Sequence, residues 1–162
     1  MKRIILSLLL MTTLTANVSA QEIYTEIRKM AQEVISNPNA NELARKTNQF
    51  KLDALDYMAI KMREQMPDST AAFLDSQALA LYNYTNLFIA TLAENKAQPA
   101  AFQVKLIELF MDASYSNPLF YDTDKTLVLA YYSDGNSFTR FSLDTDWRRA
   151  FAAATHQLKK MR

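Results

Sequence analysis

The residue types that could do chemistry are concentrated in the last third of the chain, where acidic and aromatic side chains stand close together in the sequence. Tyrosine and tryptophan combine an apolar ring with a hydrogen-bonding group, and they are frequent at binding surfaces. Aromatic rings beside carboxylates suit a sugar or a peptide and do not suit a phosphate. We therefore predict a ligand-binding surface on this part of the chain, formed by Tyr121, Asp122, Asp124, Tyr131, Tyr132, Asp134 and Trp147.

The same carboxylates allow a second interpretation, a hydrolase that acts on a glycan or on cell wall. Two carboxyl groups held about 5–10 Å apart can act as an acid and a base on a glycosidic bond, and Glu108 is a further candidate for such a pair. A serine–histidine–aspartate triad would have to use His156, the only histidine. His156 stands off the apolar stripe of the last predicted helix, so we expect an exposed or half-exposed helix residue there.

Neither a metal nor a cofactor is predicted. Cysteine and histidine are the usual zinc ligands, and the chain has no cysteine and only one histidine. Its acidic clusters lack the glycine spacing of a calcium loop. Gly135 is the only glycine, so a phosphate-binding loop or a dinucleotide fingerprint cannot be built. Asp144 is expected to cap the last helix, and Asp146 to add favourable charge to its first turn.

Five segments, about 22–36, 41–66, 69–95, 99–115 and 145–160, carry apolar residues at helical spacing. The third has no charged residue between Asp75 and Glu94, so we expect a central, largely buried helix. In the second, Lys51 and Lys61 stand off the apolar seam. Residues 126–143 contain an Asp-Gly turn signal and predict a small β-hairpin before the last helix, with a helix over 127–132 as the rival. The predicted fold is a single, mainly α bundle of about five helices.

The first twenty residues predict where the protein goes. Lys2 and Arg3 precede an apolar run over 4–11, and small residues at 18–20 suit a signal peptidase, so residues 1–20 read as a signal peptide and 21–162 as one helical domain. We expect export to the periplasm or the exterior. The lack of cysteine argues against a lipoprotein, and no later apolar run is long enough to span a membrane. Loss of the leader changes the net charge from +1 to −1, which gives no attraction to nucleic acid.

Three strings resemble small exported proteins of Bacteroidota that are all-helical and carry an uncharacterised domain: NQFKLDALDY over 48–57, MPDS over 66–69 and FSLDTDW over 141–147. The resemblance covers most of the chain after residue 20. It implies export and no particular activity. We therefore expect a non-enzymatic protein of the cell envelope that binds a protein or a glycan. The hydrolase and a self-assembling scaffold are the alternatives.

Overall fold

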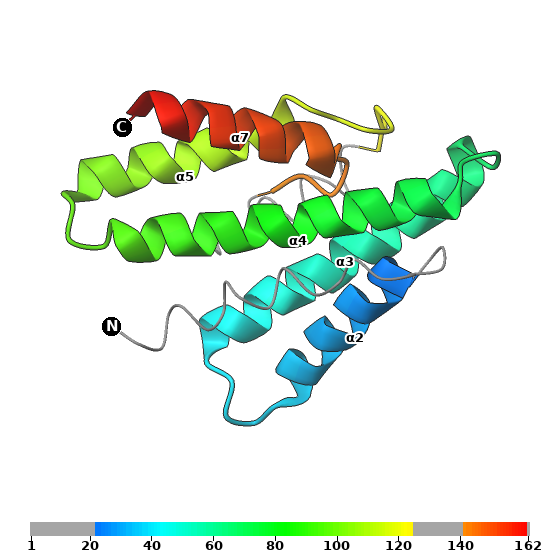
Figure 1. Ribbon diagram of the computed structural model, residues 1–162, viewed down its shortest axis with the longest axis horizontal. Helices are drawn as coiled ribbons and strands as arrows, with labels where there is room; N and C mark the ends of the chain where they lie inside the picture. Colours follow the sequence, from blue (N-terminus) through cyan, green and yellow to red (C-terminus); the bar gives the residue numbers. More distant parts are fainter. Residues whose placement is uncertain (1–21, 125–140, 162) are drawn as a thin grey trace.

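The computed structural model of the protein describes residues 22–124 and 141–161, which form five α-helices (Figure 1). Within these two ranges there is no β-strand, so the predicted mainly α class is confirmed. The predicted signal peptide and nearly all of the predicted hairpin lie outside the described residues. The helices are α2 (Glu22–Ser36), α3 (Glu42–Gln65), α4 (Ala71–Glu94), α5 (Ala100–Tyr115) and α7 (Trp147–Met161).

The helices begin and end where short polar residues and prolines stand. Asn41 caps α3, since its side-chain oxygen accepts the backbone N–H of Ala44 at 2.8 Å. Thr70 caps α4 in the same way, with the N–H of Phe73 as its donor at 3.3 Å. These caps satisfy backbone N–H groups that have no partner inside the helix. All four prolines lie close to a helix end, as expected of residues that cannot continue a helix: Pro38, Pro67, Pro99 and Pro118.

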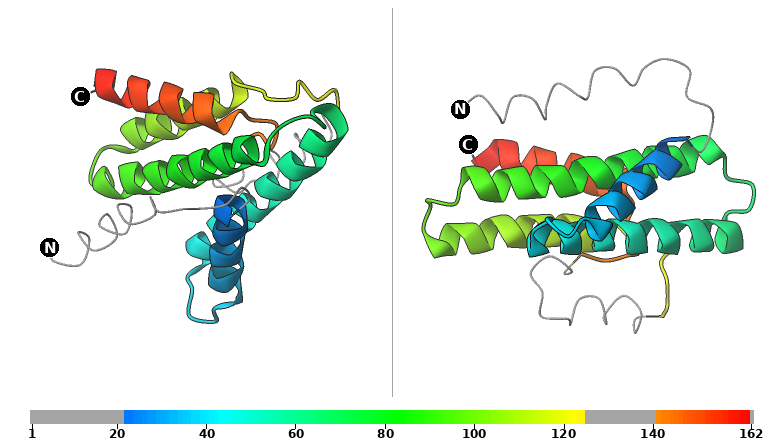
Figure 2. Two further views of the ribbon diagram at one scale, coloured as in Figure 1. Left: turned by 45° about the vertical axis from the view of Figure 1, so that its right-hand side comes forward. Right: turned by 90° about the horizontal axis from the view of Figure 1, so that it is seen from below.

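Helix α4 is the centre of the bundle. It packs against each of the four other helices, with α5 and α7 on one side of it and α2 and α3 on the other (Figure 1). The right-hand view in Figure 2, seen from below, shows α2 crossing both α3 and α4 at an angle. The position of α4 explains its lack of charge between Asp75 and Glu94, because most of its circumference is covered by other helices. The predicted central helix is therefore confirmed.

An aromatic cluster fills the core where α3, α4, α5 and α7 meet. The rings contact one another edge to face, with centroids 5.1–5.8 Å apart, which is the favoured geometry of aromatic pairs. Tyr84 also donates its hydroxyl hydrogen to the carbonyl of Phe110, so the one polar atom of its buried ring has a partner. The cluster joins four helices and the segment before α7; its members are Phe50, Tyr84, Phe88, Phe110, Phe141 and Trp147.

Two charged residues of the helices are buried. Asp75 of α4 accepts the backbone N–H of Tyr24 at 2.9 Å, which places a carboxylate at the positive end of α2. Lys51 of α3 is 5% exposed, although the sequence pattern sets it off the apolar seam. Its ammonium lies 4.8 Å from the centre of the Tyr82 ring and 3.5 Å from the Asn86 side-chain oxygen. Burial lowers the pKa of Lys51 to about 8.

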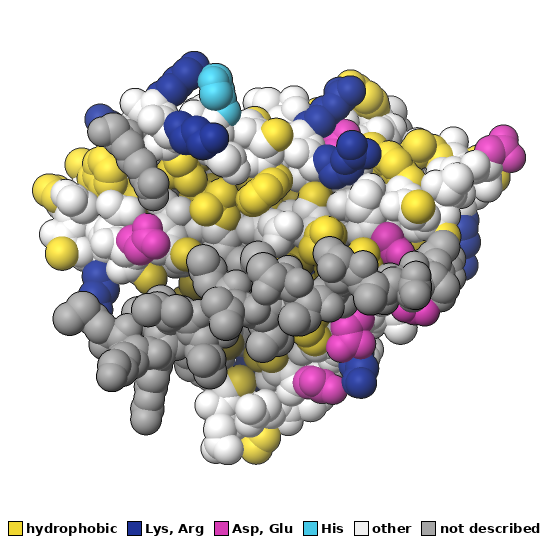
Figure 3. Space-filling view, viewed as in Figure 1, with side chains coloured by type: hydrophobic (Ala, Val, Ile, Leu, Met, Phe, Trp, Pro, Cys, Tyr) yellow, Lys and Arg dark blue, Asp and Glu magenta, His cyan; other side chains and the backbone are white. Residues whose placement is uncertain are grey.

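The outer surface of the bundle is polar over its last helix. Figure 3 shows Lys and Arg side chains and the histidine gathered over α7. His156 is exposed on that helix, as predicted. Across the described ranges, no helix combines the length and the apolar character needed to cross a lipid bilayer.

Candidate functional site

The candidate site is the loop that follows α5, residues 117–124, which contains three of the predicted binding residues. Its conformation is set by Asp144, from the segment just before α7. One carboxylate oxygen of Asp144 accepts the backbone N–H groups of Leu119 at 3.0 Å and Phe120 at 2.7 Å. The other oxygen accepts the N–H of Asp122 at 2.8 Å. Asp144 is only 5% exposed, so its charge is compensated by these three donors rather than by water.

The segment that carries Asp144 is fixed to the end of α5 by buried hydroxyl groups. The backbone N–H of Ser142 donates to the Ser114 hydroxyl at 3.0 Å, and the Thr145 hydroxyl donates to the Ser142 carbonyl at 2.7 Å. The Ser114 and Thr145 hydroxyls lie 2.8 Å apart. The Thr145 hydroxyl has one hydrogen and donates it to the Ser142 carbonyl. In the bond between the two hydroxyls, Ser114 is therefore the donor and Thr145 the acceptor. Each hydroxyl is thus both donor and acceptor, and the segment is held in one arrangement.

The start of α7 is fixed by a buried amide of α4. The Gln77 side chain donates to one Asp146 carboxylate oxygen at 3.0 Å and accepts the backbone N–H of Trp147 at 2.8 Å. The same Asp146 oxygen accepts the N–H of Arg149 at 3.2 Å, which makes Asp146 the cap of α7. The prediction that Asp144 caps this helix is therefore wrong. The helix begins two residues later, and Asp144 is left to bind the loop.

Asp122, a buried residue of the loop, is held by groups from α3. Its carboxylate accepts the Tyr57 hydroxyl hydrogen at 2.8 Å, pairs with the Lys61 ammonium at 2.9 Å and accepts the backbone N–H of Asp124 at 2.9 Å. The N–H of Asp124 and the Lys61 ammonium lower the pKa of Asp122 to about 2. Burial and the bond to Asp122 raise the pKa of the Tyr57 hydroxyl. Asp122 is therefore an ionised structural anchor at neutral pH.

Tyr121 stands between Phe120 and Asp122, two of the three residues whose N–H groups converge on Asp144. Its φ is 52°, in the left-handed region, and it is the one non-glycine residue with positive φ in the part of the chain that is described. This kink turns the N–H groups of Phe120 and Asp122 toward the same carboxylate, an arrangement typical of anion-binding backbone nests. The Tyr121 side chain consequently points outward and is 72% exposed.

The structure separates the seven predicted site residues into three groups. Tyr121 and Asp124 are exposed on the loop, and Asp122 lies just beneath them, 7% exposed. Trp147 is fully buried in the aromatic cluster and presents no surface to a ligand. The remaining three, Tyr131, Tyr132 and Asp134, lie outside the described residues.

Four further residues shape the site, and the sequence pattern did not assign them to it: Asp144, Tyr57, Lys61 and Gln77. Asp144 stood in the acidic cluster, but its spacing from α7 suggested a cap. Nothing in the spacing indicates that its partners are N–H groups more than twenty residues earlier in the chain. Tyr57 and Lys61 share one face of α3 four residues apart, which was the only available signal for a common partner.

The ionised Asp122 already uses its carboxylate for three internal contacts. Within 22–124 and 141–161, no three histidine, aspartate or glutamate side chains come together as metal ligands would. Comparisons with models of known protein families, with curated proteins and with solved structures found no match for this chain.

Proposed function

We propose that this protein is a non-enzymatic binding protein of the cell envelope whose partner, a protein or a glycan, contacts a surface centred on Tyr121. The observation that carries the proposal is an aromatic side chain, 72% exposed, on a residue with φ of 52°. A left-handed conformation costs a non-glycine residue about 1–2 kcal/mol. In the free protein, the exposed Tyr121 ring gains little packing energy that could offset this cost. Strain of this kind is concentrated at functional sites.

The loop is prepared for binding because it is already ordered. The three bonds to Asp144 and the three contacts of Asp122 fix the backbone on both sides of Tyr121. A partner therefore does not have to order the loop, and less of the binding energy is lost as conformational entropy. Tyrosine is among the residue types that dominate interface energies.

The neighbouring groups favour a partner with both apolar and hydrogen-bonding parts. The exposed Tyr121 ring can stack on a sugar face or on an apolar side chain, and its hydroxyl can donate or accept a hydrogen bond. Asp124, also exposed, adds a carboxylate that accepts hydrogen bonds from sugar hydroxyls or peptide N–H groups. In the sequence, this loop is followed by three further predicted binding residues, Tyr131, Tyr132 and Asp134. The predicted signal peptide supports an envelope location.

The alternative of a carboxylate-based hydrolase is less well supported. Such an enzyme needs one carboxyl group that keeps its proton near neutral pH, which requires a raised pKa. The pKa of Asp122 is lowered to about 2 by its partners, so this residue is unsuited to act as the acid.

The test compares the loop tyrosine with an exposed apolar residue elsewhere. Tyr121→Asn keeps a residue that tolerates positive φ, so the free energy of unfolding should be unchanged or up to about 1 kcal/mol higher. The same change should weaken binding at least tenfold, since the main aromatic contact is lost. Partners are sought with a photocrosslinking residue at the exposed Thr123 in the producing cells, and with the purified protein on a glycan array.

The control is Leu43→Ala, which removes an apolar side chain that is 50% exposed at the start of α3. It should leave both the crosslinked partner and the glycan signal unchanged. Equal retention of the partner by Tyr121→Asn and the original protein would overturn the proposal, and so would equal loss of binding in Leu43→Ala. A signal on the array or a crosslinked protein decides between the two partner classes.

A further inference from the structure

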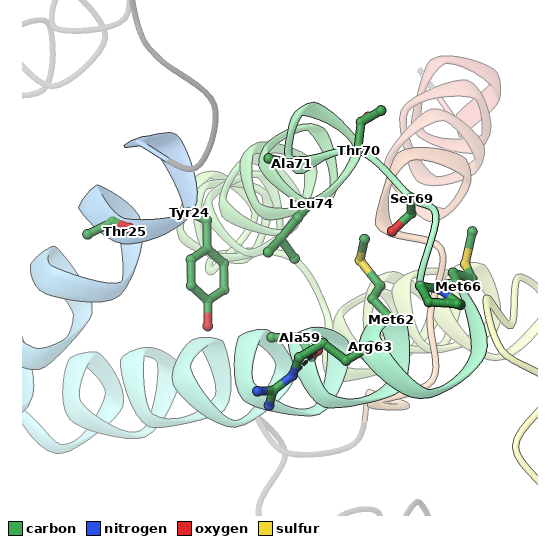
Figure 4. A pocket seen from close by; sticks show the side chains of 11 residues that line it. Tyr24, Thr25, Ala59, Met62, Arg63, Met66, Ser69, Thr70, Ala71 and Leu74 are labelled. Carbon is green, nitrogen blue, oxygen red and sulfur yellow. Dashed lines mark hydrogen bonds between the residues drawn. The ribbon is translucent and has the colours of Figure 1, made fainter.

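A cleft of about 380 Å³ lies away from the Tyr121 loop, between the start of α2, the last turns of α3 and the beginning of α4 (Figure 4). Pockets that bind small molecules usually have volumes of about 300–1,000 Å³. An engineered protein cavity of about 150 Å³ holds one benzene molecule, so this cleft has room for a body of roughly two such rings. The cleft is therefore large enough for a small organic ligand.

The inner wall of the cleft is apolar. Met62 and Leu74 are buried, and Ala59 and Met66 are half-buried beside them. Figure 4 shows Leu74 extending from α4 toward α3 and Met62 extending from α3 toward α4, with Met66 farther along α3. Methionine side chains are unbranched and adapt to ligands of different shape. This wall suits an alkyl chain or an aromatic ring.

Polar groups stand at the other side of the same cleft. Tyr24 extends its ring from α2, with its hydroxyl directed toward α3 (Figure 4). Within the described part of the chain, Arg63 is the one charged residue that lines the cleft. Its Nε donates to the carbonyl of Ala59 at 3.3 Å, and among the described residues no carboxylate is paired with its guanidinium. The terminal nitrogens of Arg63 are thus available to an anion.

From this arrangement we infer that the cleft binds a small carboxylate with an apolar body, such as a medium-chain fatty acid or an aryl-alkanoic acid. The apolar body lies against Met62 and Leu74, and the carboxylate pairs with the Arg63 guanidinium, which presents a fork of donors that matches its two oxygens. The Tyr24 hydroxyl supplies a further donor at the same end. This site is independent of the Tyr121 surface, and each can be tested without the other.

The experiment titrates the full-length protein, labelled with ¹³C in its methionine methyl groups, with sodium octanoate. The methyl resonances of Met62 and Met66 should shift and saturate, while that of Met111, on α5, should not move. 1-Octanol should bind at least tenfold more weakly, because it lacks the charge that pairs with Arg63. Arg63→Gln should weaken octanoate binding about tenfold or more, as expected for the loss of a charge-assisted bond.

Two further variants complete the test. Arg45→Gln removes an exposed cation from the same helix, at a distance from the cleft in sequence, and should leave octanoate binding unchanged. Ala59→Leu fills part of the cleft and should weaken octanoate and octanol alike. The inference is overturned if all the methionine resonances shift together, if none shifts, or if Arg63→Gln and Arg45→Gln have the same effect.

Discussion

Replacing Asp144 with alanine tests whether this residue holds the Tyr121 loop. The change removes the acceptor of three backbone N–H groups, those of Leu119, Phe120 and Asp122. A hydrogen bond to a charged group contributes about 1.5–3 kcal/mol, but the freed N–H groups can regain water where the loop opens. We therefore expect the free energy of unfolding to fall by about 3–5 kcal/mol, a large part of the 5–15 kcal/mol typical of a domain.

A subtler variant, Asp144→Asn, keeps the shape of the side chain. The side-chain carbonyl oxygen of the asparagine can still accept the N–H groups of Leu119 and Phe120. Its NH₂ group then faces the N–H of Asp122, and two donors cannot form a hydrogen bond with each other. We expect a smaller loss of about 2–3 kcal/mol, consistent with one lost bond and one unsatisfied donor. The effect should be local and centred on the N–H of Asp122.

Two measurements follow these variants: guanidinium-induced unfolding for stability, and amide hydrogen exchange for the loop. The three N–H groups should exchange faster in Asp144→Ala. The matched control is Asp146→Ala, which removes both the helix cap and the acceptor of the buried Gln77 amide; it should cost about 2–3 kcal/mol while leaving those N–H groups protected. If Asp144 were instead the cap, its loss would cost about 1 kcal/mol with no change in loop exchange. That result would refute the assignment.

Two other predictions concern the buried charges. Between pH 8 and about 10.5 the unfolded chain binds more protons than the folded chain at Lys51, so stability should rise with pH in that window. Lys51→Met should remove this rise and add up to about 3 kcal/mol to the free energy of unfolding at pH 7. Denaturant unfolding at pH 7 and 9.5 measures both effects. The prediction is contradicted if the free energy of unfolding changes equally with pH in the variant and in the original protein. Asp75→Ala should lower stability by about 1–2 kcal/mol, because the Tyr24 N–H loses its charged acceptor. It should also speed exchange of that amide; an unchanged exchange rate there would count against it.

The helices themselves could be predicted from the sequence, because their signals are local. Apolar spacing and the four prolines place all five within a few residues of their observed ends. The uncharged stretch after Asp75 indicates the burial of α4, since a charge is rarely buried without a partner. These features depend on neighbours in the chain, and the sequence records them directly.

Lys51 shows where this local reasoning fails. A lysine off the apolar seam is normally solvated, yet its long stem can be covered while the ammonium rests over a ring of another helix. Asp144 shows the same limit, because its hydrogen-bond partners lie in a loop that is distant in the sequence. Whether Asp144 or Asp146 caps α7 depends on where the backbone places each of them.

The bond between Asp144 and the N–H of Asp122 has a consequence for the chain that joins them. It ties the loop that follows α5 to the segment just before α7, on either side of residues 125–140. The entropy lost in closing a connection grows only slowly with its length, by about 0.6 kcal/mol for each doubling. Through closure entropy alone, a connection of different length between these two segments should therefore change the stability of the helical bundle only slightly.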